Sequence, residues 1–201
     1  MAVSARMKAI FQSLGMVAAA CLLAQCASSS SASGGKGKEA YDKLLPQINA
    51  PQSLNYQGLT YVVGYSAANQ NGVLVEYFPV GEDSKSWTQM LALRSIEKQT
   101  SPQQEFSELE KQAAARGQGL RKAPGSSAAD CGLSFTIQKP RTTEFNMFRY
   151  THGVGGTTTS LQYAAALPPQ TVRLGGGALN AVAEKHGAAV MRMPMPEIGR
   201  Q

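Results

Sequence analysis

Two alternating runs joined by a turn constrain the fold of this chain more strongly than any other feature. Leu59–Tyr65 and Val73–Tyr77 place apolar side chains at every second position, which is typical of strands with one buried face. The residues between them, Asn69–Gly72, favour a tight turn because asparagine and glycine tolerate positive φ. The pattern therefore predicts an antiparallel hairpin.

More apolar runs surround this hairpin. Trp87–Glu97 fits a strand or a helix, and we adopt the strand. Leu133–Gln138, Phe145–Tyr150 and Thr159–Ala165 also alternate as strands do. The stretch before the hairpin, Gln47–Gln57, is interpreted as a loop because it contains proline and asparagine.

Two segments have helical signatures. Ser101–Arg116 begins with an N-capping serine, has proline at its first helical position, and places Gln104 where a capping box needs it. A second helix is predicted over Ala178–Lys185, with Gly187 at its end.

The order of these elements predicts an α+β fold. Short connections between successive strands favour an antiparallel sheet, here of about five to six strands with two packed helices. The 201 residues, of which 43% are hydrophobic, suit one globular domain with appendages. We expect that domain over 51–190 and an extended tail over 191–201.

The N-terminus has the pattern of an export signal. Arg6 and Lys8 form a positive start, and Ala9–Ala24 is mostly apolar but too short for a comfortable membrane span. The next stretch, Ser28–Lys38, is rich in serine and glycine and predicts a flexible tether. A signal peptide over 1–25 and a tether over 26–50 follow.

A cysteine at this junction predicts a lipid anchor. Leu23–Cys26, with sequence LAQC, resembles the lipobox of bacterial lipoproteins, although Gln25 replaces the usual small residue before the cysteine. The runner-up is Cys21, which lacks the preferred leucine; Cys26 is favoured because the tether begins directly after it. The resemblance implies acylation, including palmitate, and stable membrane attachment. Ala27, rather than aspartate, implies an outer-membrane lipoprotein that faces the periplasm of the cell envelope.

The net charge makes nucleic acid an unexpected partner. The formal charge is +6, and removing Arg6 and Lys8 from the 19 Lys and Arg leaves 17 against 13 Asp and Glu. These positive residues are spread along the chain rather than clustered as nucleic-acid binding requires. Weak attraction to an anionic envelope polymer or to an envelope protein partner remains open.

A few residues could carry chemistry. Cys131, His152 and His186 could form a thiol–imidazole pair, but zinc would need four closely spaced ligands, so we predict no metal site and no cofactor. Glu82 and Asp83 could act as paired carboxylates, although adjacent acids in a loop are more often solvated.

One aromatic residue stands out beside those acids. Trp87 is the only tryptophan and could stack on a ligand, with Glu82 beside it, but a single tryptophan next to a strand is more often part of the core. We predict no catalytic residue; Trp87 and Glu82 are the possible ligand-facing side chains.

Part of the chain resembles a family of uncharacterised exported bacterial proteins. Glu76–Glu82 and Trp87–Leu91 match that family's E-[FY]-x-P-x-G-[EQ] and W-x-x-M segments, and Phe148–Tyr150 and Gln162–Ala164 are similar to two later ones. The sequence departs from the pattern at Ala165, where those proteins often have arginine. The resemblance implies an exported protein and assigns no functional residue.

The resulting hypothesis is a lipid-anchored envelope protein with a non-catalytic binding or scaffolding domain. One alternative is an envelope hydrolase that uses Cys131 or the loop of Glu82 and Asp83. Another is an accessory component of an envelope transport or secretion assembly.

Overall fold

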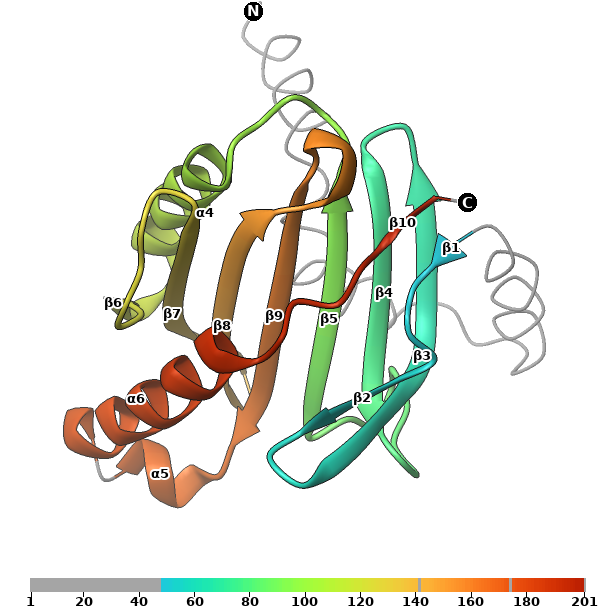
Figure 1. Cartoon of the computed structure of the whole chain (residues 1–201). Helices are drawn as coiled ribbons and strands as arrows, with labels where there is room; N and C mark the ends of the chain where they lie inside the picture. Colours follow the sequence, from blue (N-terminus) through green and yellow to red (C-terminus); the bar gives the residue numbers. More distant parts are fainter. Residues whose placement is uncertain (1–47, 141, 174, 201) are drawn as a thin grey trace, which may run out of the picture. The chain divides into compact units, whose positions relative to one another are not determined.

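The computed structural model in Figure 1 describes residues 48–140, 142–173 and 175–200, all of which belong to one compact unit. The first strands are β1 (Ile48–Asn49), β2 (Ser53–Tyr56), β3 (Leu59–Asn69), β4 (Gly72–Pro79) and β5 (Gln89–Ile96). After helix α4 (Pro102–Arg116) come β6 (Gln118–Lys122), β7 (Asp130–Gln138), β8 (Thr143–His152), the short 3-10 turn η2 (Val154–Gly156) and β9 (Thr158–Leu167). The chain closes with α5 (Pro169–Arg173), α6 (Gly176–Arg192) and β10 (Gly199–Arg200).

The main sheet is antiparallel and has eight strands in the order β2-β3-β4-β5-β9-β8-β7-β6. A small second sheet pairs β1 with β10. The predicted α+β class with an antiparallel sheet is therefore confirmed, while the strand number of about five to six was too low. The missed strands of the main sheet are β2 and β6. The first follows Pro51 in a stretch interpreted as a loop, and the second has five exposed residues without an apolar period.

Two glycines explain the geometry of the β3–β4 hairpin. Gly72 has φ +139, and a Cβ there would lie 1.8 Å from the carbonyl oxygen of Ser95 on β5. The register of β3 shifts at Gly64, where a Cβ would lie 2.4 Å from the ring of Phe78. The hairpin predicted from the alternation is thus confirmed, and glycine lets its neighbours approach closely.

The two long helices lie on opposite faces of the sheet, which we call the α4 face and the α6 face (Figure 1). Helix α4 packs on β6, β7 and β8. It starts with the predicted capping box, in which the Ser101 hydroxyl accepts from the Gln104 amide and the Gln104 side chain accepts from the Ser101 amide. Its buried residues include Phe106, Leu109 and Ala113, at the spacing of one helical face.

The α6 face carries the larger core. After α6, the chain crosses this face toward β10, and Ile198 is buried there (Figure 1). The strands contribute alternate residues to this core, among them Tyr61, Val75, Tyr77, Leu91, Leu93, Phe145, Met147, Leu161 and Tyr163.

Helix α6 is longer than predicted. The expected end at Gly187 was wrong, since the helix continues to Arg192. Gly187 is buried in the helix, and a Cβ there would lie 3.9 Å from Pro124. Within residues 48–140, 142–173 and 175–200, no helix is long and apolar enough to cross a membrane.

Candidate functional site

The structure does not bring together the cysteine and the histidines considered as a reactive set. The Cys131 sulfur lies on the α4 face, 3.5 Å from the carbonyl oxygen of Pro102. His186 lies on α6, which covers the opposite face, and His152 is exposed at the end of β8. Across the described segments, no group of three or more His, Cys, Asp or Glu side chains could hold a metal ion.

Burial makes Cys131 a poor nucleophile. Its side chain is 2% exposed, and burial raises the pKa of the thiol to about 11, with the nearby Asp130 charge adding to the effect. The thiol is therefore protonated at neutral pH, whereas a nucleophilic cysteine needs its thiolate.

The carboxylates of Glu82 and Asp83 bond to their own loop. Glu82 accepts from the amide and the hydroxyl of Thr88, both at 2.6 Å. Asp83 accepts from the amides of Lys85 and Ser86 and from the Ser86 hydroxyl. The Lys85 amide is the main cause that lowers the pKa of Asp83. The two acids hold the turn that leads from β4 into β5.

Trp87 lies on the α4 face. It is half-buried and packs against an apolar cluster formed by Leu74, Phe78, Met90, Ala92 and Ala164. Glu76 is on the same face, where burial raises the pKa of its carboxyl and the nearby Arg94 charge opposes that rise. The tryptophan thus contributes to packing.

A strip of buried polar side chains crosses the α4 face beside this cluster. The Arg94 guanidinium donates to Gln162 at 2.7 Å, the Gln162 amide donates to Asn146 at 2.9 Å, and the Asn146 amide donates to Glu144 at 3.0 Å. Lys139 closes the strip with an ion pair to Glu144. Each of the four residues from Arg94 to Glu144 is at most 5% exposed. Such connected bonds fix the register of β5, β9 and β8, because a slip would leave buried polar groups without these partners.

Arg149 attaches helix α6 to the sheet. Its guanidinium donates twice to Asp130 on β7, at 2.8 and 2.7 Å, and also to the carbonyl oxygens of Val190 and Met193 at the end of α6. A positive charge at a helix C-terminus is favourable, because the last carbonyl groups carry partial negative charge. This arginine therefore has a structural role.

A cluster of tyrosines surrounds His186 on the α6 face. The Tyr163 ring stacks on the imidazole with centroids 4.4 Å apart, and the Tyr56 hydroxyl lies 2.9 Å from Nδ1. Tyr61 and Tyr163 both donate their hydroxyls to the Gln89 side chain. Burial lowers the pKa of His186 to about 4, helped by the Lys185 charge, so the imidazole is neutral at pH 7.

This cluster is part of the core. Tyr56, Tyr61 and Tyr163 are 4%, 0% and 2% exposed. Burial raises the pKa of each hydroxyl, that of Tyr61 to about 12. Rings this deeply buried are closed to a ligand in the folded protein. The contacts of His186 with Tyr56 and Tyr163 instead join α6 to β2 and β9.

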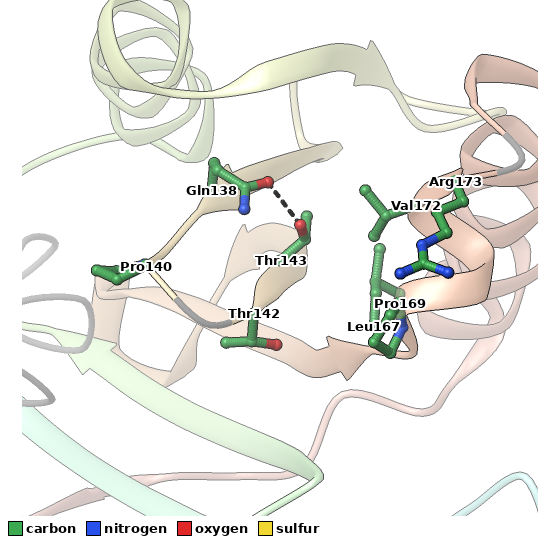
Figure 2. A pocket seen from close by; sticks show the side chains of 8 residues that line it. All are labelled: Gln138, Pro140, Thr142, Thr143, Leu167, Pro169, Val172 and Arg173. Atoms are coloured by element: carbon green, nitrogen blue, oxygen red, sulfur yellow. Dashed lines mark hydrogen bonds between the residues drawn. The ribbon is translucent and has the colours of Figure 1, made fainter.

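A pocket of about 280 Å³ opens at one end of the sheet. In Figure 2, side chains of the β7–β8 turn face those of the β9 end and α5 across this space. The Thr143 hydroxyl donates to the Gln138 side chain at 2.6 Å. The lining residues are Gln138, Pro140, Thr142, Thr143, Leu167, Pro169, Val172 and Arg173.

None of these pocket residues was singled out from the sequence. The pocket is built from the ends of elements that are distant along the chain, and only strand pairing places Thr143 opposite both Gln138 and Leu167. The visible signal was the proline pair after β9, which marks a turn but no site. The predicted lipid-attachment residues, Cys26 and Cys21, lie outside the described residues.

Comparison with known proteins shows a family. Residues 48–193 match the sequence model of one protein family, which covers the domain from β1 to the residue after α6. The chain belongs to that family. No curated protein matches the chain.

A solved structure with some likeness is that of LpqN of Mycobacterium tuberculosis, described as involved in cell envelope biogenesis. The two sequences are 12% identical, and the match covers 76% of this chain and 83% of LpqN with a TM-score of 0.31.

Proposed function

We propose that this protein is a lipid-anchored component of the bacterial cell envelope whose α+β domain binds a ligand or partner without catalysing a reaction. The observation that carries the non-catalytic part is the placement of the reactive side chains. Cys131 and His186 lie on opposite faces of the sheet, and Glu82 and Asp83 bond to their own loop. The pocket at the end of the sheet supports the binding part.

The envelope location is proposed from the N-terminal sequence. A positive start, an apolar stretch and LAQC ending at Cys26 form the pattern of an exported lipoprotein, and Ala27 favours the outer membrane. Anchoring through several acyl chains is stable. A serine- and glycine-rich tether then lets the domain reach ligands or partners near the membrane surface.

Alkylation of Cys131 tests the non-catalytic part directly. Protein purified from membranes is treated with iodoacetamide at pH 8, with and without urea, and intact mass follows the reaction. Because burial raises the pKa of this thiol to about 11, we expect the native protein to react at least about a hundredfold more slowly than the unfolded protein.

The pH dependence of the native reaction is the control. Native alkylation as fast as that in urea, with a profile that rises below pH 7, would reveal a reactive thiolate and would support the hydrolase hypothesis instead. A native rate that rises only at strongly alkaline pH supports the proposal.

A further inference from the structure

The pocket at the end of the sheet also indicates what kind of ligand it takes. We propose that it binds a small amphipathic anion, a carboxylate or phosphate ester on a short apolar chain, with Arg173 holding the oxyanion. This inference rests on the binding function proposed above and adds the chemical class of the ligand.

The charge of the pocket selects an anion. Among the described residues that line the pocket, Arg173 is the charged one, and its exposed side chain is at the end of α5. Across residues 48–140, 142–173 and 175–200, the ion pairs involve other cations, and none includes Arg173. A guanidinium presents paired donors that match a carboxylate or a phosphate.

The closest acid along the β7–β8 turn does not compete for this arginine. Glu144 is buried on the α4 face, where Lys139 and the Asn146 amide occupy its oxygens. Ala166, which pairs with Glu144, lies on that face too. The next pair, Thr143 and Leu167, lies on the α6 face, where the pocket opens. The neutral, hydroxyl-bearing wall of Thr142 and Thr143 therefore lies across the pocket from the positive charge of Arg173.

The other walls are apolar and set the size of the ligand. Leu167 is 7% exposed and joins the core, while Val172 packs against the same core from α5. Two prolines, Pro140 and Pro169, complete these walls without offering backbone donors. At about 280 Å³ the space is at the small end of ligand sites and suits a short chain.

A titration series tests the inference on the full chain purified from membranes in a non-ionic detergent. The probes are butanoate and butyl phosphate, with neutral butanol and cationic butylammonium as controls. Binding is measured from the amide NMR shifts of Thr142, Thr143 and Val172. We expect both anions to bind with dissociation constants on the order of millimolar, as suits ligands this small, and the controls to bind at least about tenfold more weakly.

A matched pair of variants isolates the charge. Arg173→Gln removes the guanidinium from the pocket, and Arg116→Gln removes one from the same position of α4, since each arginine is exposed and is the last residue of its helix. Arg173→Gln should weaken both anions about tenfold, and Arg116→Gln less than about twofold. Circular dichroism spectra that match the unmodified protein confirm that both variants are folded.

Three results would overturn the inference: butylammonium binding as well as butanoate, equal losses in the two variants, or no probe shifting the pocket amides. Any of these in a protein whose lipid anchor is demonstrated would refute the ligand class and leave the proposed envelope binding function standing. Anion binding in a protein that carries no lipid would support the ligand class and refute the proposed lipid anchor.

Discussion

Replacing Arg149 by methionine should destabilise the domain more than any change of an exposed arginine. Methionine keeps much of the aliphatic volume but removes the two hydrogen bonds to Asp130 and the hydrogen bonds to the carbonyl oxygens of Val190 and Met193. The Arg149 side chain is 12% exposed, so its bonds are only weakly screened by solvent.

The expected magnitude follows from these contacts. The Asp130 side chain is 35% exposed, which limits the ion pair to about 1 kcal/mol. The bonds to the end of α6 are made by a charged donor to backbone carbonyls, and losing them costs about 1–3 kcal/mol more. The free energy of unfolding should therefore fall by about 2–4 kcal/mol, and the melting temperature by about 5–15 °C for a domain of this size.

Urea unfolding provides the assay, because Trp87 is the only tryptophan and is half-buried in the cluster of the α4 face. Asp130→Asn and the double variant complete a cycle that isolates the pair. Arg116→Met is the matched control and should change stability by less than about 0.5 kcal/mol. A loss for Arg149→Met below about 1 kcal/mol, or a loss as large in the control, would refute the structural role of Arg149.

Three further predictions concern the strip, the histidine cluster and the glycine contact. Gln162→Leu breaks the middle of the buried strip and should cost about 2–4 kcal/mol in urea unfolding; a cost below about 1 kcal/mol would show that the strip does not hold the register. The pKa of His186 falls from 6.5 to about 4 on folding. The contribution of the neutral imidazole to the free energy of unfolding is therefore fully present above pH 6.5 and is lost as pH falls toward 4. Since this side chain is partly exposed, the loss should be about 1–2 kcal/mol between pH 7 and pH 4, and His186→Gln should flatten that part of the stability curve; an unchanged slope in the variant contradicts the assignment. Gly64→Ala should cost about 1–3 kcal/mol through its contact with a buried ring, whereas Gly177→Ala, which has open space in α6, should be neutral or slightly stabilising; equal effects would argue against the contact.

Local signals predicted the elements that have a period and a boundary. The capping box at Ser101 and the alternation on both sides of Asn69–Gly72 correspond to α4 and to the β3–β4 hairpin. The strand interpretation of Trp87–Glu97 was confirmed as β5, which lies between β4 and β9 in the sheet.

The signals failed where tertiary contacts decide the structure. Strand β6 is exposed along its whole length and contains glycine at φ +65, so it forms because β7 offers an edge to pair with. A glycine often ends a helix, but Gly187 is buried within α6, which continues to Arg192, where Arg149 donates to the carbonyl oxygens of Val190 and Met193.

The roles of the buried polar residues and of the pocket residues were harder to predict than the fold. The polar strip joins Arg94, Gln162 and Asn146 from three strands, and their roles depend on which strands are neighbours. The pocket depends in the same way on the register that places Thr143 beside Leu167. Cysteine is a reactive residue type, but burial raises the pKa of the Cys131 thiol, and burial cannot be read from the sequence.

The intact mass of the protein purified from its own membranes, measured beside a Cys26→Ala variant, tests the proposed function most directly. The account predicts a chain that begins at Cys26 and carries acyl groups, and it predicts that the variant lacks both the cleavage and the lipid. A chain cleaved elsewhere and free of lipid would contradict the anchor and would favour a protein that diffuses in the periplasm or outside the cell.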